Sequence, residues 1–239
     1  PSPALSPMRN IDLEKLEQND IFEDSDNEND SDRHLPFFKN QFAEDGSLYS
    51  GQMKYGKRHG KGKQLWKDGK HYMGRFNQDK IEGFGKMVHS DGDIYIGDWV
   101  NNMAHGFGKY QSMKGWVYEG EFLLDRSHGK GKETWSDGST YEGSFRLGKR
   151  HGKRVFYHAD GSYYTGEFMH GFYHGKGKKI WADSRIYEGD WVRGKKEGYG
   201  TLIWPNGDHY EGHFDEDKIN GFGIFSWKDG KIYFGQWKD

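Results

Sequence analysis

The chain of 239 residues is long enough for a large core, yet only 33% of its residues are hydrophobic and 30% are charged. A compact domain of this length is normally richer in aliphatic side chains, so the composition argues against an ordinary globular core. No cysteine is present, which excludes disulfide and thiolate chemistry, and no apolar run approaches the roughly 20 residues of a membrane-spanning helix. The apolar material is instead aromatic, with 9 Trp, 15 Tyr and 16 Phe beside 36 Gly, a pairing that suits a thin sheet.

Residues 1–36 are acidic: they contain ten acids and three bases, a net charge of −7, which leaves about +5 for the rest of a chain whose total is −2. That mild positive charge is far below the concentrated charge of a nucleic-acid-binding surface, so no nucleic acid is predicted as a partner. We expect this tail to be mostly disordered, because the run from Glu23 to Asp32 is acidic and rich in Asn. Apolar residues among charges between Asn10 and Phe22 predict one short amphipathic helix, either transient or docked on the rest of the chain or on a partner.

A unit of 23 residues repeats from Tyr49 onward with no insertion or deletion. Each unit starts with a tyrosine, and these are Tyr49, Tyr72, Tyr95, Tyr118, Tyr141, Tyr164, Tyr187, Tyr210 and Tyr233. A glycine follows two residues later and a bulky residue four later, and in each full unit a second glycine follows eleven later. Residues 49–239 are therefore predicted to be an array of eight full repeats and a truncated ninth. Residues 37–48 look like a degenerate half repeat, or cap, whose Phe37 and Phe38 are expected to cover the first edge of a sheet.

One repeat, residues 118–140, shows the predicted local structure. Residues 118–122 (YEGEF) and 129–135 (GKGKETW) alternate between two kinds of side chain, as a strand with two unlike faces does. The five or six polar residues between them are expected to form a loop, and Asp137-Gly138 predicts a tight turn into the next repeat. Each repeat is then a β-hairpin. The predicted fold class is all-β, an elongated single-layer antiparallel sheet of tandem 23-residue β-hairpins.

The two faces of this sheet are predicted to differ. One face holds the tyrosines, the bulky residues and both glycines of each repeat. We expect the rings of one strand to lie over the glycines of its neighbour, which would account for both recurring glycines. The opposite face carries glutamates such as Glu119 across from lysines such as Lys132, and cross-strand pairs of this kind contribute about 0.2–1 kcal/mol each.

The stretch 95–99 (YIGDW) followed by 105–108 (HGFG), and its equivalents at 118–122 and 128–131, resemble the MORN repeat (membrane occupation and recognition nexus). The resemblance covers residues 49–239. It implies an elongated single-sheet fold, self-association as a homodimer, and a role in binding partners within scaffolds of cilia, cytoskeleton and membrane junctions, in a cytoplasmic setting. It also implies two alternatives: binding of anionic phospholipids, or service as the accessory region of a larger enzyme such as a lipid kinase. Arg154 and Ser184 depart from the pattern, because each replaces a glycine.

Histidines recur ten residues after the tyrosine, at His59, His105, His128, His151 and His174. Successive equivalent positions lie about 9–10 Å apart across two strand spacings, whereas metal ligands lie about 2 Å from one centre. A structural role near the turn is therefore favoured over metal binding, and no metal or cofactor is predicted. A periodic sheet also offers no enclosed pocket, and no phosphate-binding loop motif is present, so we expect a chain without enzymatic activity.

The ring-lined face has two compatible interpretations. The rings form the core of a one-layer fold, and they also floor a groove for a helical or extended segment of a partner protein, the chain's own N-terminal tail included. We therefore hypothesise a non-enzymatic scaffold that binds a partner segment on a concave aromatic face. The predicted contact residues are Trp66, Tyr72, Phe76, Tyr95, Trp99, Tyr118, Phe122, Trp135, Tyr141, Tyr164, Trp181, Tyr187, Trp191, Trp204 and Tyr210.

Attachment to an anionic membrane is the alternative function, and it depends on three basic pairs. These pairs are Lys57 with Arg58, Lys149 with Arg150, and Lys195 with Lys196. All are predicted to lie in the hairpin loops along one long edge of the sheet, where each basic residue contributes about 1 kcal/mol on an acidic bilayer. A third hypothesis is an accessory module beside a catalytic domain, because the sequence ends within a repeat at Asp239.

Overall fold

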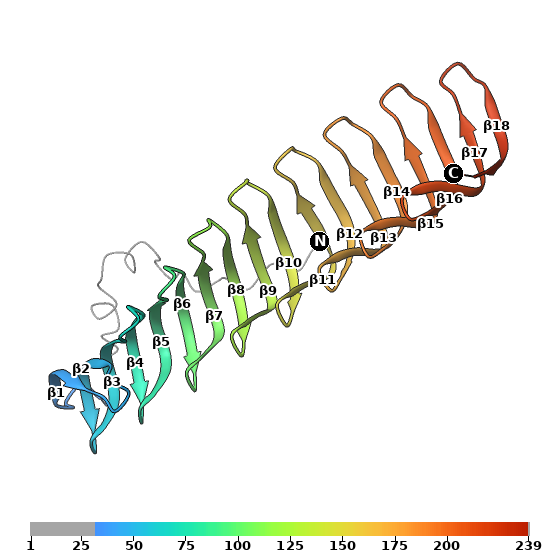
Figure 1. Ribbon diagram of the computed structural model, residues 1–239. Coiled ribbons are helices and arrows are strands. Elements are labelled where there is room, and N and C mark those ends of the chain that lie inside the picture. Colours follow the sequence, from blue (N-terminus) through green and yellow to red (C-terminus); the bar gives the residue numbers. More distant parts are fainter. Residues whose placement is uncertain (1–31, 239) are drawn as a thin grey trace. The chain divides into compact units, whose positions relative to one another are not determined.

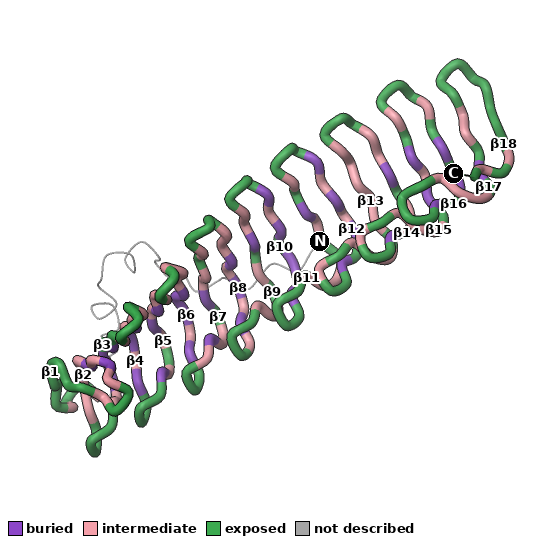
Figure 2. The backbone as a smooth tube through the Cα atoms, in the orientation of Figure 1, coloured by how far each residue is buried: buried purple, intermediate pink, exposed green. Residues whose placement is uncertain are grey.

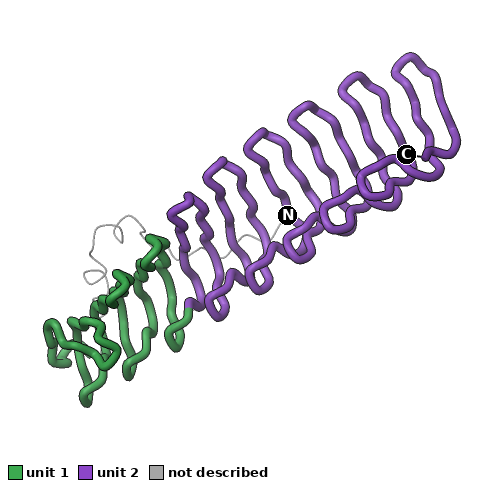
Figure 3. The backbone as a smooth tube through the Cα atoms, in the orientation of Figure 1, with its two compact units in different colours: residues 1–103 green, residues 104–239 purple. Residues whose placement is uncertain are grey.

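The structure is a computed structural model that describes residues 32–238, and in this range it contains β-strands and no helix. It forms two compact units, residues 1–103 and 104–239, which are coloured separately in Figure 3. The strands of unit 1 are β1 (Phe37–Phe42), β2 (Leu48–Lys54), β3 (Lys57–Leu65), β4 (His71–Asn77), β5 (Lys80–Val88) and β6 (Ile94–Val100). Those of unit 2 are β7 (Met103–Gln111, whose first residue closes unit 1), β8 (Val117–Leu123), β9 (Arg126–Thr134), β10 (Thr140–Arg146), β11 (Lys149–Tyr157), β12 (Tyr163–Met169), β13 (Phe172–Ile180), β14 (Ile186–Val192), β15 (Lys195–Ile203), β16 (His209–Asp215), β17 (Lys218–Ser226) and β18 (Ile232–Trp237). The disorder and the short helix predicted for the tail lie outside the described residues.

Within each unit, strands that follow one another in sequence pair antiparallel, which confirms the predicted single layer of tandem hairpins (Figure 1). In the repeat that begins at Tyr118, this tyrosine lies opposite Glu133, and Gly120 lies opposite Gly131. The Asp-Gly turns also form as predicted: the Trp135 N–H donates to the Ser139 carbonyl oxygen at 2.9 Å. In unit 1, β1 pairs with β2, so residues of the half repeat 37–48 provide the edge strand of that unit.

The turn inside each hairpin is shorter than the sequence predicts. The five- or six-residue loop is wrong: β8 ends at Leu123 and β9 begins at Arg126, so only two residues turn the chain. Leu124 (φ 51°) and Asp125 (φ 63°) both occupy the left-handed region, as a type I′ turn requires. Asp125 also ties the turn to the preceding repeat, because its N–H donates to the Ala104 carbonyl at 3.0 Å and its Oδ1 accepts from the Ala104 N–H at 2.7 Å.

The glycines two and eleven residues after the tyrosine have different roles. This corrects the prediction that both are explained by packing beneath a ring. In β9, the register with β8 shifts between Gly120 and Glu121, and Gly129 sits at this bulge with φ 57°. A bulge inserts extra residues into one strand and bends it, and glycine adopts the required conformation without strain. Gly120 and the glycine opposite it, Gly131, are the ones that lie beneath the Tyr118 ring.

The ring–glycine packing itself is confirmed. A Cβ placed on Gly166 would lie 2.5 Å from the Tyr164 hydroxyl oxygen and 2.6 Å from the Cα of Gly177, the glycine opposite. The Tyr164 ring therefore fills the space above both glycines, and its hydroxyl donates to the Glu167 carbonyl at 2.9 Å. A Cβ at either glycine of this pair would therefore meet the ring, which would have to shift to make room.

A ladder of rings forms the core of each unit. In unit 2 the Tyr164 ring meets Phe168 of its own repeat at 5.2 Å and Trp191 of the next repeat at 5.4 Å, both edge to face. The same alternation of ring contacts recurs along the array. It leaves the tyrosines that begin the repeats, from Tyr72 to Tyr210, at most 3% exposed. Figure 2 shows buried residues alternating with more exposed ones along many strands of unit 2, as expected for a sheet with one packed face.

The two departures from the repeat pattern change the structure little. Arg154 replaces the glycine opposite Gly143. These two residues are not paired in the strand register, but the residues before and after Gly143, Glu142 and Ser144, are. Ser184 takes the turn position with φ 68°, so a non-glycine residue adopts the left-handed conformation there. The hairpin that contains Arg154, formed by β10 and β11, has the same bulge as the other repeats.

Removing one ring should break the ladder locally. Tyr187 is fully buried between Trp191 (5.1 Å) and Phe214 (5.0 Å), and its hydroxyl donates to the Asp190 carbonyl at 3.0 Å. We predict that Tyr187→Ala lowers the free energy of unfolding by about 3–5 kcal/mol, the usual cost of deleting a buried ring. Tyr187→Phe keeps the ring and should cost about 1 kcal/mol for the hydrogen bond alone. Urea unfolding of both variants checks this, and equal losses would contradict the ring ladder as the core.

Candidate partner-binding surface

The ring-lined face of each hairpin, here called the inner face, has an exposed part on its second strand. Beyond the glycine pair, this strand places two more residues on the inner face, 15 and 17 positions after the tyrosine. The second of these opens the Asp-Gly turn, as at Trp181, whose N–H donates to the Arg185 carbonyl at 3.0 Å. We call the indoles at this position the tryptophan row: Trp66 in unit 1, and Trp135, Trp181, Trp204 and Trp227 in unit 2.

The predicted contact residues fall into two groups in the structure. The members of the tryptophan row are half-buried, or exposed in the case of Trp227. The others are buried in the ring ladder, namely Tyr72, Phe76, Tyr95, Trp99, Tyr118, Phe122, Tyr141, Tyr164, Tyr187, Trp191 and Tyr210. The tryptophan row packs on residues 15 positions after a tyrosine: Trp135 lies 5.3 Å from Phe156, and Trp204 lies 5.3 Å from Phe225, between ring centroids. Binding of a partner by these residues stays a prediction.

Cationic side chains surround Trp181. The Lys179 amino group lies 5.3 Å from the Trp181 ring centroid and 5.5 Å from that of Tyr173, and the Lys196 amino group lies 5.6 Å from Trp181. Burial lowers the pKa of Lys179, because a desolvated ammonium group is less stable than one in water. Rings and cations in this arrangement attract each other through the ring quadrupole, so they form one surface that is both apolar and positive.

A buried acid and an arginine lie beside Trp135. The Arg150 guanidinium lies 5.4 Å from the Trp135 ring centroid and 5.0 Å from that of Phe156. Glu133 is only 8% exposed, and burial raises the pKa of this carboxyl group to about 7, an effect that the charge of Arg150 partly offsets. Sequence reasoning did not single out Glu133, although a signal was present: it is a charged residue on the strand face that also carries Gly131 and Trp135.

The basic pairs do not lie in loops along an edge, which corrects their predicted location. Lys57, Lys149 and Lys195 each begin the second strand of a hairpin and are exposed. Their neighbours Arg58, Arg150 and Lys196 point to the inner face, where Arg58 lies 5.6 Å from the Phe76 ring centroid and Lys196 lies 5.9 Å from that of Tyr187. Each pair thus offers one cation to the solvent and packs the other on rings.

The recurring histidines face the other side of the sheet, here called the outer face, where they support turns. The Leu147 N–H points at His128 Nδ1 at 3.5 Å, and the Gln78 N–H points at His59 Nδ1 at 3.4 Å. Glu82 replaces a histidine and accepts from the Asn101 N–H in the same way at 3.0 Å. These contacts bear out the predicted structural role near the turn for His59 and His128. In the part of the chain that the structure describes, no group of histidine and acidic side chains could hold a metal ion.

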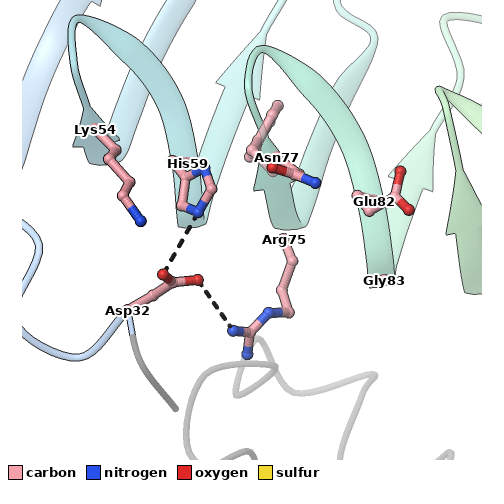
Figure 4. Close-up of a pocket in the computed structure, with 8 residues that line it drawn as sticks. Asp32, Lys54, His59, Arg75, Asn77, Glu82 and Gly83 are labelled. Carbon is pink, nitrogen blue, oxygen red and sulfur yellow. Dashed lines mark ion pairs between the residues drawn. The ribbon is translucent and has the colours of Figure 1, made fainter.

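Two open hollows lie on the outer face. One, of about 540 Å³ in unit 2, is lined by residues that include Lys153, Lys176 and Glu188. The other, of about 270 Å³ in unit 1, is shown in Figure 4. There the Asp32 carboxylate lies 3.4 Å from His59 Nε2 and 3.6 Å from a guanidinium nitrogen of Arg75. These two contacts place Asp32, the last acid of the tail, against the array.

These features define a class of protein: a single-layer array of β-hairpins whose rings are both core and surface. The MORN repeat family model matches residues 49–71, 72–94, 95–117, 118–140, 141–163, 164–184, 187–209 and 210–232. The chain therefore belongs to the MORN-repeat family. No curated protein matches it in full-sequence comparison.

Several solved structures resemble the chain only distantly. The TCP10 domain of Danio rerio CPAP is 10% identical over 84% of this chain and 94% of that one, with a TM-score of 0.43. The TCP domain of Drosophila melanogaster SAS-4 (dCPAP), in complex with a proline-rich motif of Ana2, is 13% identical over 75% and 85% of the two chains, with a TM-score of 0.31. Likenesses this weak carry no argument about function. Within residues 32–238, no helix is long and apolar enough to cross a membrane.

The burial of Glu133 should make stability depend on pH. Because the folded state raises the pKa of this group from an ordinary value near 4.5 to about 7, the folded state binds more protons than the unfolded state between these values. Stability is then lost as the pH rises through this window, by up to about 3 kcal/mol. We predict that Glu133→Gln is more stable than the wild type at pH 8 and similar to it at pH 4.5, as measured by urea unfolding. The exposed Glu142→Gln is the control, and an equal gain in that variant would contradict the assignment.

Proposed function

We propose that this chain is a non-enzymatic scaffold that binds a segment of a partner protein on the tryptophan row. The observation that carries the proposal is the position of these indoles: apart from the exposed Trp227 they are half-buried beside the ring ladder, so they are partly packed and still accessible. Tryptophan and arginine are the residues that most often dominate binding energy when they stand in such a setting. Membership of the MORN-repeat family agrees with a role in protein interaction.

The surface favours a segment over a compact ligand. This position holds an indole in five of the eight full repeats, with His89, Ser112 and His158 in the others, so the indoles are separate anchors and not one deep cavity. A helix or an extended strand presents side chains at regular intervals and can engage several anchors at once. The cations around Trp181, together with Arg150 beside Trp135, favour a segment in which acidic residues flank apolar ones.

Membrane attachment is less well supported by the geometry than partner binding. Of each basic pair, only Lys57, Lys149 and Lys195 are exposed, because the second cation packs on rings, and the Lys195 amino group already pairs with Glu216 at 3.2 Å. Half of the charge that the sequence offered for lipid headgroups is thus oriented toward the inner face. Homodimer formation, a cytoskeletal, ciliary or membrane-associated location and an accessory role beside an enzyme stay predictions.

The tryptophan row can be tested by capturing partners with variants. We predict that Trp135→Ala, Trp181→Ala and Trp204→Ala combined weaken binding of the relevant partner at least ~10-fold, because these three indoles are anchors and not ladder rungs. Tyr157→Ala is the matched control, since Tyr157 is an aromatic residue of β11 that is 53% exposed on the outer face. The measurement is quantitative capture followed by titration of the purified partner against all three proteins. A partner that tolerates the triple variant but is lost with Tyr157→Ala would overturn the proposal.

A further inference from the structure

The outer face of unit 1 differs in chemistry from that of unit 2. In unit 2 the residue after the repeat tyrosine is an acid in most repeats, as at Glu119 and Glu142, and these two lie on either side of Lys132. The equivalent positions in unit 1 are Ser50, Met73 and Ile96. Unit 1 thus has neutral and apolar residues at the outer-face position that carries a glutamate in most repeats of unit 2.

The apolar residues at this position are part of a cluster. Ile96 is 8% exposed and packs with Met73, Phe84 and Ile94, which are themselves partly buried. The four side chains come from β4, β5 and β6, and all lie on the face opposite the tyrosines. An apolar cluster on the solvent side of a one-layer sheet marks a contact site, because no second layer of the array covers it.

Basic residues surround this cluster. Lys63 lies opposite Ser50 and Met73, and Lys86 lies opposite Met73 and Ile96. In unit 2 the equivalent Lys132 has a glutamate on each side. The outer face of unit 1 is therefore apolar at its centre, with Lys63 and Lys86 beside Met73 and with Asp98 opposite Phe84. The two lysines, which lie opposite neutral residues, match a segment with apolar residues next to an acidic run.

The N-terminal tail has this composition and joins the array on this face. Asp32 contacts His59 on β3 and Arg75 on β4, both on the outer face, and Gln52 Nε2 donates to the Asp32 carbonyl at 2.7 Å (Figure 4). The residues before Asp32 are acidic from Glu23 onward, and Ile11, Leu16 and Phe22 provide apolar side chains further upstream. The nine residues 23–31 can span up to about 30 Å, whereas β4 to β6 lie within about 10–15 Å of the Asp32 contacts.

We propose that residues 10–22 of the same chain dock on the Met73, Phe84, Ile94 and Ile96 cluster, with the acidic run 23–31 lying over Lys63 and Lys86. Asp32 fixes the start of this fold-back. The docked segment serves as the second layer that unit 1 otherwise lacks on its outer face. The inner face stays open, so this contact is independent of partner binding on the tryptophan row.

Hydrogen exchange on the full chain tests the proposal. In the wild type, the amides of residues 10–22 should exchange at least ~10-fold more slowly than those of an unstructured peptide. Met73→Glu with Ile96→Glu should return them to unstructured rates, because these changes install a charge under the apolar side chains. Both substitutions introduce the residue type that most repeats of unit 2 carry at this position, so the array should tolerate them. Slow exchange of the β4–β6 amides in this variant will verify that the array remains folded. Thr165→Glu makes the same change at the equivalent position of unit 2 and should leave residues 10–22 protected.

A change in the tail keeps the test decisive if the array variant is destabilised. Leu16→Asp leaves the array untouched and should likewise abolish the protection of residues 10–22. Unstructured exchange rates in the wild type would overturn the proposal, as would protection that survives both sets of changes. Protection that increases with protein concentration would show that the tail docks on a second copy, which also contradicts the fold-back.

Discussion

The structure depends on one close approach, that of a tyrosine ring to a pair of glycines on adjacent strands. A single sheet has no facing layer, so its apolar residues must be buried within their own face. The Tyr164 ring achieves this by lying across Gly166 and Gly177, whose missing side chains leave room for it. Phe168 of the same repeat and Trp191 of the next repeat then cover the ring edges. Burial therefore propagates from repeat to repeat, and no repeat can bury its ring alone.

This constraint explains why the period is invariant. The ring of one repeat must meet the rings of the next, and the turn residue Asp125 must reach the backbone of Ala104, 21 residues earlier. An inserted residue would move the ring off its glycines and, since side chains alternate between faces, would send the following residues to the wrong side. The bulge at Gly129 is the one irregularity that the repeat contains, and it recurs in register, so the rings remain aligned.

Much of this fold could be predicted from the sequence, because the tyrosine and glycine spacings encode it directly. The length of the hairpin turn could not, since Leu124 and Asp125 adopt left-handed conformations without being glycines and their polar neighbours resemble a loop. The short turn has a second consequence: β11 already begins at Lys149, so the alternation along this strand places Arg150 over the rings while Lys149 is exposed. Sequence reasoning assigned these polar residues to a loop and did not apply the alternation of a strand to them, and it therefore placed both members of each basic pair at an edge.

The same constraint determines where the array can vary. The tyrosine, the glycine pair and the bulky residue are fixed by ring packing, but the positions 15 and 17 residues after the tyrosine lie on the inner face without covering a glycine. Position 15 carries Glu133, Phe156, Lys179 and Leu202 in successive repeats of unit 2. A buried carboxylate there lowers stability when ionised, so folding alone does not favour it. Positions 15 and 17 can thus vary between repeats with little loss of ring-ladder stability. A segment bound on the inner face would contact the same positions, so their side chains would select the partner.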